Sequence, residues 1–269
     1  MKNLLVIYYS QTGRLKEIIS NFVKSWNGFF NIDFVEIKCD AIPFPMSYRQ
    51  FFDVFPESVL KLPAKIDYTI QDKEYDCIVF GFQPWFLHTS IPINSFMQTD
   101  DFKKLVKKTV ILVSDSRNTW RNSLNEVITE VEKNGGNLKG SFIFRDTAKN
   151  RRGFFSLYNW LSGKKKRIEK ASSTGGISQE IIDSASIYGA KALEALNGEN
   201  RVYCVIPHVD EEITSIKYEQ YAIDKYLKWA KFIRKNNFKH RKFKLLLFKI
   251  WLLFMFFVMS PHISNKTKE

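Results

Sequence analysis

The chain alternates between apolar runs and segments in which apolar residues recur every three or four positions. Runs of strand length, apolar throughout or alternating with polar residues, cover residues 4–8, 32–38, 76–82, 109–113 and 138–144. Helical spacing is clearest over residues 15–26, 120–133 and 179–196. Strands that alternate with helices predict an α/β fold, a doubly wound parallel sheet of five strands in the order 2-1-3-4-5. For the short run 202–206, a sixth strand and a loop both remain open.

A polar turn joins the first predicted strand to the first predicted helix. It reads Ser10-Gln11-Thr12-Gly13-Arg14-Leu15. The free backbone N–H groups and the positive dipole end of a helix N-terminus favour a phosphate dianion. The hydroxyl groups of Ser10 and Thr12 can donate further hydrogen bonds to it. The turn therefore predicts a phosphate site, and an ordinary strand–turn–helix corner is the alternative interpretation.

The loops after the third and fourth predicted strands carry further candidate binding residues. The third strand is followed by Pro84-Trp85-Phe86-Leu87, whose aromatic rings suit stacking against a planar ligand. The fourth leads into a polar turn that includes Ser114, Asp115, Arg117, Asn118 and Trp120. Ligands of doubly wound sheets bind at the carboxyl ends of the strands, where we expect these loops to meet. Core packing of Trp85 and Phe86, and helix capping by Asn118, are the alternative interpretations.

The turn over residues 10–15 resembles the phosphate loop of flavodoxin-like proteins, which hold the FMN 5′-phosphate with a Ser-x-Thr-Gly-x-Thr pattern. Leu15 stands where that pattern has a second Thr, so one hydroxyl contact is lost and Arg14 is the candidate to compensate. The resemblance implies a flavodoxin-like fold with insertions and a C-terminal helical, apolar extension, and FMN as the cofactor. The implied FMN-binding residues are Ser10, Gln11, Thr12, Gly13, Arg14, Leu15, Pro84, Trp85, Phe86, Leu87, Ser114, Asp115, Arg117, Asn118 and Trp120.

Longer motifs resemble a narrower group, the dialkylresorcinol condensing enzymes of aryl-polyene and flexirubin-type pigment pathways. These motifs lie at residues 5–11, 51–57, 83–87, 91–96 and 117–120. The group implies FMN-dependent dehydrogenation of a 2,5-dialkylcyclohexane-1,3-dione to the aromatic resorcinol, with a partner ketosynthase forming the carbon–carbon bonds. A condensation by this chain is disfavoured, because none of its Cys residues is expected on a nucleophile turn beside an activating His. An NAD(P)H–quinone reductase and a flavodoxin-type electron carrier for a membrane partner are the alternatives.

His88 follows the aromatic loop and is the candidate general base, because histidine titrates near neutral pH. A hydrogen-bonded loop histidine without a catalytic role is the alternative interpretation. The three Cys and four His residues are scattered without the spacing of metal ligands, which predicts no metal site and suits a reducing cytoplasm.

The net charge of +13 is concentrated in two segments. Residues 149–170 hold eight basic residues and one acid, residues 225–269 hold twelve and one, and the rest of the chain is net acidic.

Within the second segment, fourteen of the fifteen residues over 245–259 are apolar, but Lys249 interrupts them. The ten continuous apolar residues that follow Lys249 fall short of the roughly 20 needed to span a bilayer. A short apolar segment beside a basic cluster predicts peripheral attachment to the anionic inner face of the cytoplasmic membrane, and a helix buried in a homodimer interface is the alternative.

These features predict two parts of the chain. Residues 1–235 form a flavodoxin-like domain with a basic, aromatic insertion near 149–178, and residues 236–269 form a basic, apolar tail that associates with membrane. We interpret the insertion as a lid near lipid and substrate; nucleic acid is disfavoured because no recognition module accompanies the basic residues. Long additions at 39–75, 149–178 and 199–244 favour a substrate site over a plain electron carrier. We therefore expect a cytoplasmic enzyme with a hydrophobic small-molecule substrate.

Overall fold

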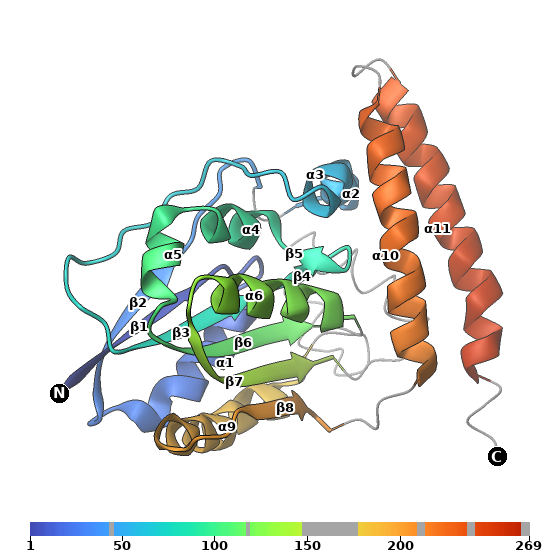
Figure 1. The fold of residues 1–269 in the computed structure, drawn as a ribbon. Coiled ribbons are helices and arrows are strands. Elements are labelled where there is room, and N and C mark those ends of the chain that lie inside the picture. The colour runs from blue at the N-terminus through green and yellow to red at the C-terminus, as the bar shows by residue number, and fades with distance from the viewer. Residues whose placement is uncertain (43–45, 117–118, 147–176, 209–212, 236–239, 265–269) are drawn as a thin grey trace.

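The structure is a computed structural model, and it describes residues 1–42, 46–116, 119–146, 177–208, 213–235 and 240–264. Six parallel strands form the central sheet (Figure 1). In chain order they are β1 (Lys2–Tyr8), β2 (Phe30–Glu36), β3 (Cys77–Phe82), β6 (Thr109–Ser116), β7 (Asn137–Arg145) and β8 (Val202–Ile206). Their order across the sheet is β2-β1-β3-β6-β7-β8.

This order confirms the predicted α/β fold, because its first five strands follow the doubly wound order 2-1-3-4-5. The run 202–206 is a sixth strand, which pairs in parallel with β7 at the edge of the sheet. The order reverses at β1: the chain moves outward from β1 to β2 and returns to β3 on the other side of β1. Such a reversal is the place where doubly wound sheets bind their ligands, outside the carboxyl ends of the strands.

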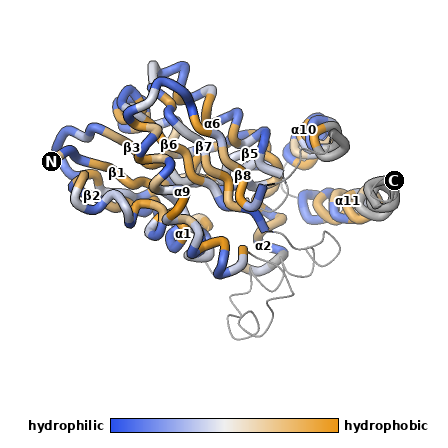
Figure 2. The backbone as a smooth tube through the Cα atoms, turned by 90° about the horizontal axis from the view of Figure 1, so that it is seen from below, coloured by the Kyte–Doolittle hydropathy of each residue, from blue (hydrophilic) through white to orange (hydrophobic). Residues whose placement is uncertain are grey.

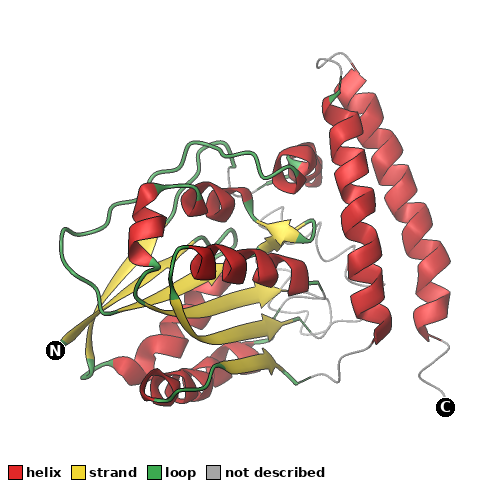
Figure 3. Ribbon diagram, viewed as in Figure 1, coloured by secondary structure: helices red, strands yellow, loops and turns green. Residues whose placement is uncertain are grey.

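The strands alternate their side chains between two hydrophobic cores, one on each face of the sheet. In β1, Leu4 and Val6 belong to one core, and Leu5 and Ile7 belong to the other. The first face is covered by α1 (Arg14–Phe22), the 3-10 segment η1 (Val23–Trp26) and α9 (Gln179–Asn197). The second face is covered by α2 (Tyr48–Asp53), α3 (Phe55–Val59), α4 (Ile91–Met97), α5 (Asp100–Leu105) and α6 (Arg121–Lys133) (Figure 3).

The long connection over 39–75 contains α2 and α3, which the sequence analysis did not predict. A capping box between Ser47 and Gln50 begins α2, and Pro56 lies in the first turn of α3. With six and five residues, these helices are too short for a helical period to be recognised. Elsewhere the predictions are close: the helix predicted over 15–26 divides into α1 and η1, and the helix predicted over 120–133 begins at Arg121.

The contact between α9 and α1 depends on a glycine. A Cβ atom added to Gly189 would lie 1.7 Å from the carbonyl oxygen of Phe22. The indole Nε1 of Trp26 donates a hydrogen bond of 2.8 Å to the carbonyl oxygen of Gly189. The close approach therefore requires the absence of a side chain at this position, and it brings α9 against the helix that begins at the predicted phosphate turn.

The last two helices, α10 (Ile213–Arg234) and α11 (Arg241–Ser264), lie side by side at one end of the molecule (Figures 1 and 2). Phe248 of α11 is fully buried, and its ring stacks on Phe55 of α3 with 3.9 Å between ring centres. Arg241, at the start of α11, forms an ion pair of 2.6 Å with Glu57. Helix α11, which lies within the predicted tail, therefore buries apolar residues against helices of the predicted domain. The predicted insertion lies largely outside the described residues.

In the described part of the chain, no helix combines the length and the apolar character that crossing a membrane requires.

Candidate functional site

The predicted phosphate turn lies between the end of β1 and the start of α1. Gly13 is the N-cap of α1 and has φ of 85°, in the left-handed region that favours glycine. A Cβ atom at Gly13 would meet no described atom within 4 Å. Glycine is therefore favoured here by the left-handed conformation and not by the close approach of a neighbour. The hydroxyl of Ser10 accepts a hydrogen bond of 3.3 Å from the backbone N–H of Lys16, which ties the turn to the first turn of α1.

Thr12 has a hydroxyl oxygen that is shielded from solvent and has no hydrogen-bond partner among the described residues. Within the same residues, no side chain caps the helix at Gly13. Most buried polar atoms in proteins are hydrogen-bonded, so a shielded hydroxyl without a partner calls for an explanation. Beside the free N–H groups of a helix N-terminus, its position fits a bound phosphate oxygen.

Arg14 and Leu15, the last two residues of the predicted phosphate loop, are held by the fold. A guanidinium nitrogen of Arg14 donates a hydrogen bond to the carbonyl oxygen of Ile177, just before α9. The side chain of Leu15 is fully buried and packs under Gly81 of β3. Leu15 can therefore offer a ligand only its backbone N–H, and the missing Thr hydroxyl is replaced by a core contact.

Gln83, the residue that follows β3, connects the turn after β1 to the end of β6. Its Oε1 accepts a hydrogen bond of 3.0 Å from the backbone N–H of Gln11, and its Nε2 donates one of 2.8 Å to Oδ1 of Asp115. All three residues are buried. The carboxyl ends of three neighbouring strands are thus linked by one side chain. Gln83 was not among the predicted binding residues, although a buried strand directly before it and Pro84 after it placed it at the ligand-binding edge.

Asp115 ends in a buried carboxyl group at this edge. Burial raises its pKa to about 6, against the lowering effects of the Gln83 hydrogen bond, its own backbone N–H and the positive charge of Arg14. The neighbouring Ser114 is fully buried, and its hydroxyl has no partner among the described residues. A carboxyl group that changes charge near neutral pH, next to a second unpaired hydroxyl, is typical of a binding or reaction site rather than of inert packing.

The aromatic residues after β3 form a short hairpin of β4 (Pro84–Trp85) and β5 (His88–Thr89). Its two turn residues, Phe86 and Leu87, have φ of 49° and 72°, a conformation that costs an ordinary residue about 1–2 kcal/mol. The ring of Trp85 lies edge-on to Tyr9, with 6.0 Å between centres, and that of Phe86 stacks on Phe51 at 4.6 Å. Phe86 thus packs against the layer formed by α2 and α3, and a role of Trp85 or Phe86 beside a flavin stays a prediction.

Trp120 is buried and held by residues from three other elements. Its indole Nε1 donates a hydrogen bond of 3.1 Å to the hydroxyl of Tyr203 on β8. The guanidinium groups of Arg121 and Arg145 lie over its ring, 4.5 Å and 5.0 Å from the ring centre. Contact of Trp120 with a flavin also stays a prediction. The remaining predicted binding residues, Arg117 and Asn118, lie outside the described residues.

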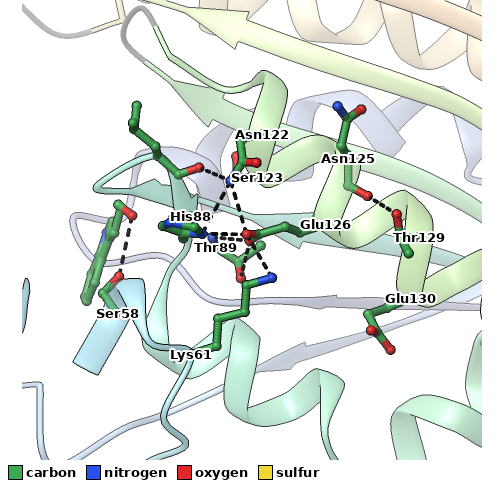
Figure 4. A network of polar contacts seen from close by, with 12 residues as sticks. Ser58, Lys61, His88, Thr89, Asn122, Ser123, Asn125, Glu126, Thr129 and Glu130 are labelled. Atoms are coloured by element: carbon green, nitrogen blue, oxygen red, sulfur yellow. Dashed lines mark hydrogen bonds and ion pairs between the residues drawn. The ribbon is translucent and has the colours of Figure 1, made fainter. Parts of the chain in front are cut away.

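His88 belongs to a polar cluster on the α6 side of the hairpin (Figure 4). Its Nδ1 lies 2.5 Å from Oε1 of Glu126, and the same carboxylate forms an ion pair of 2.9 Å with Lys61. Glu126 also accepts hydrogen bonds from the backbone N–H of Thr89 at 3.0 Å and from Nδ2 of Asn122 at 3.1 Å. Burial favours the protonated carboxyl, but His88, Lys61 and the Thr89 N–H outweigh it and lower the pKa of Glu126.

This cluster opens onto a groove of about 850 Å³ beside α4 and α6. Two side chains in its lining have shielded nitrogen atoms without a partner among the described residues: Nε2 of His88 and Nδ2 of Asn94. His88 was predicted from the sequence and Glu126 was not; the spacing of four residues between Asn122 and Glu126 on a predicted helix was the available signal. The cluster therefore holds a histidine whose Nδ1 contacts a carboxylate and whose shielded Nε2 has no partner in the described part of the chain, an arrangement that suits proton transfer.

Comparison with known proteins finds only distant similarity. No family model and no curated protein matches the chain. Solved structures that resemble it include a flavoprotein in complex with FMN from Lactobacillus acidophilus, a putative flavoprotein from Bacteroides uniformis and a flavodoxin, WrbA-like protein, from Agrobacterium tumefaciens. Their identities to this chain are 19%, 22% and 13%, with TM-scores of 0.44, 0.42 and 0.41. The matches cover 53%, 61% and 74% of this chain and 93%, 98% and 100% of the others.

Proposed function

We propose that this protein is a flavin-dependent oxidoreductase that binds FMN across the carboxyl ends of β1, β3 and β6. The observation that carries the proposal is the N-terminus of α1, where the left-handed Gly13 adjoins the shielded, unpaired hydroxyl of Thr12. This N-terminus lies at the reversal of strand order, where flavodoxin-like sheets bind FMN. Backbone N–H groups there would hold the phosphate.

The residues around this turn suit the rest of FMN. The Ser114 hydroxyl and the Asp115 carboxyl lie at the end of β6 and offer hydrogen-bonding groups for the polar edge of the isoalloxazine ring. Trp85, in the hairpin after β3, is the candidate to wall the ring. When bound, FMN would supply two-electron transfer to or from a substrate. The polar cluster around His88 would supply the accompanying proton transfer, with Glu126 positioning the imidazole.

We further propose that the substrate is a hydrophobic cyclic dione that is converted to a 2,5-dialkylresorcinol. Loss of two hydrogen atoms from a 2,5-dialkylcyclohexane-1,3-dione gives the aromatic product, so two electrons and two protons leave the substrate. FMN would accept the electrons and a quinone would reoxidise it, while a ketosynthase partner would supply the dione. Support comes from the sequence motifs and from the aromatic layer of Phe51, Phe52 and Phe55, which packs around Phe86 beside the proposed flavin.

A quinone reductase with a nicotinamide donor is the second candidate. The groove beside α4 and α6 is its candidate donor site, because Lys61, Lys103 and Lys133 line this groove and a pyridine dinucleotide carries negative phosphates. Each lysine is ion-paired with a carboxylate, of Glu126, Asp100 and Glu130 respectively, so a dinucleotide would have to exchange these ion pairs for phosphate contacts. An electron carrier without a substrate site would leave this groove and the cluster around His88 without a role. The two enzymes differ in the direction of electron flow, so anaerobic mixing distinguishes them: the dione bleaches the oxidised flavin in one case, and NAD(P)H does so in the other.

The proposed phosphate site is tested by two substitutions that differ only in charge, Gly13→Asp and Gly13→Asn. Both residues tolerate the left-handed conformation better than others do, but only Asp repels a phosphate. Two unit charges 4 Å apart repel by about 4 kcal/mol at an effective dielectric constant of about 20, so Gly13→Asp should weaken FMN binding at least about 100-fold. Gly13→Asn should weaken it much less.

Gly28 provides the matched control for this experiment. It also has a left-handed conformation, with φ of 91°, and a Cβ atom there would meet no described atom within 4 Å. Gly28→Asp should therefore introduce similar backbone strain and the same charge away from the proposed site. Equal FMN affinity in the Gly13→Asp, Gly13→Asn and Gly28→Asp variants, measured by fluorescence titration, would contradict the proposal.

A further inference from the structure

Helix α11 exposes a continuous apolar face. The side chains of Phe243, Leu246, Ile250, Leu253 and Phe254 are between 41% and 62% exposed. Their spacing of three and four residues places them along one side of the helix. Five large apolar side chains in a row differ from the isolated exposed apolar residues that are normal on protein surfaces.

This apolar face points away from the rest of the molecule. The opposite side of α11 holds the buried residues Leu245 and Phe248, and the ring of Phe248 packs against Phe55 of α3 and Trp229 of α10. The ion pair between Arg241 and Glu57 and the hydrogen bond from Lys244 to the carbonyl oxygen of Phe232 (2.9 Å) fix the rotation of the helix. Figure 1 shows α11 as the outermost helix, beyond α10. The apolar face is therefore set by the fold and is not a consequence of loose attachment.

The surroundings of this face are strongly basic. Residues 225–264 hold ten Lys or Arg residues and no Asp or Glu. Of these, Lys228, Lys231, Arg234 and Lys235 are exposed at α10 and just after it, and Lys242 is exposed on α11. Such a distribution attracts an anionic partner and repels another copy of itself. It therefore disfavours a face-to-face dimer of the α10–α11 pair.

We propose that the apolar face of α11 and the lysines of α10 dock this protein on the surface of an anionic bilayer. Helix α11 would lie in the plane of the interface, with its five apolar side chains among the acyl chains and the exposed lysines at the lipid headgroups. A mainly apolar helix face that is flanked by basic residues has the composition of interfacial helices.

Docking in this way would bring the proposed flavin site near the bilayer. The strands β6, β7 and β8 run toward the end of the molecule where α10 stands (Figure 3). Glu219 of α10 accepts a hydrogen bond of 2.9 Å from the backbone N–H of Asn122, at the start of α6. The docking helices are thus joined to the carboxyl edge of the sheet, so a substrate that partitions into lipid would meet the site there. The docking proposal itself stands without the proposed flavin chemistry.

The experiment measures cosedimentation of the full-length protein with vesicles that contain about one-third phosphatidylglycerol in phosphatidylcholine. The double variant Leu246→Glu, Ile250→Glu should bind at least about 30-fold more weakly, because it places charges in the apolar face. The double variant Lys228→Ala, Lys231→Ala should lose a factor of about five for each lysine. Raising the salt from about 0.1 M to about 1 M should reproduce the second loss but not the first.

Two residues elsewhere serve as matched controls. Phe34 on β2 and Ile187 on α9 are 49% and 60% exposed, so the variant Phe34→Glu, Ile187→Glu likewise replaces two apolar side chains by Glu at similar exposure. It should bind vesicles like the wild type. Equal binding by the α11 variant and the wild type would overturn the proposal. Wild-type protein that binds anionic vesicles no more strongly than purely zwitterionic ones would also overturn it. The same holds if the wild type is a dimer, the α11 variant is a monomer and the two bind vesicles equally.

Discussion

Asp115 gives the sharpest test of the electrostatics at the carboxyl edge of the sheet. Its pKa of about 6 in the folded protein, compared with an ordinary value near 3.9, corresponds to roughly 3 kcal/mol of differential stability. Because the pKa is raised, the folded state holds the proton more tightly than the unfolded chain does. The stabilising contribution is therefore complete below about pH 4 and is lost as the pH rises through about 6.

The substitution Asp115→Asn removes this dependence while keeping an oxygen that accepts the hydrogen bond from Gln83. Between about pH 3 and about pH 7.5, the difference in free energy of unfolding between variant and wild type should shift by roughly 3 kcal/mol in favour of the variant, with most of the shift between about pH 4 and pH 6. Urea unfolding of the flavin-free protein at several pH values measures it. Asp224→Asn, at an exposed position on α10, serves as the control. A difference for Asp115→Asn that does not change with pH would refute the reasoning.

Three further predictions concern other parts of the molecule. Trp85→Ala should restore the fluorescence of bound flavin, if the ring lies against this indole, and unchanged fluorescence and affinity would make Trp85 a core residue only. Glu126→Gln should destabilise the protein by about 3 kcal/mol at neutral pH, because it breaks the buried contacts with His88 and Lys61. That loss should shrink as the pH falls through the lowered pKa of Glu126, and a loss that is constant with pH in urea unfolding would contradict it. Gly189→Ala should cost about 3 kcal/mol through the clash with the backbone of Phe22, whereas Gly198→Ala, whose added Cβ would lie 3.7 Å from its nearest neighbour, should cost far less.

The parts of the fold that could be predicted from the sequence depend on local patterns. The strand β1 is an apolar run, α6 repeats apolar residues at helical spacing, and the turn at Gly13 has a short recognisable sequence. Each of these features is complete within about fifteen residues, and the doubly wound order follows from their alternation. The position of the phosphate turn at the reversal of strand order follows in the same way.

The parts that could not be predicted depend on residues far apart in the sequence. The link from Gln11 through Gln83 to Asp115 joins three strands, and the pairing of His88 with Glu126 joins a hairpin to a helix. No local period reveals such contacts. Helix α10 escaped prediction although its buried residues Ala222, Tyr226, Ala230 and Ile233 recur every three or four positions. Two of these four are alanines, and the exposed apolar residues Tyr221 and Phe232 obscure the period.

The packing of α11 also depends on contacts with residues far away in the sequence. The segment that forms α11 is more basic and more apolar than the rest of the chain, and this composition predicts a tail. Only the structure shows that Phe248 inserts between α3 and α10 and that Arg241 pairs with Glu57. One side of the helix therefore belongs to the core, and only the other side is left for a partner.

The central claim, a phosphate cradle for FMN at the N-terminus of α1, is tested most directly by comparing FMN with riboflavin. The two ligands share the isoalloxazine ring and differ in the phosphate. Two or three charge-assisted hydrogen bonds at the turn predict that FMN binds the flavin-free, full-length protein at least about 100-fold more tightly than riboflavin does. Equal affinities for the two ligands, or no binding of either, would contradict the claim.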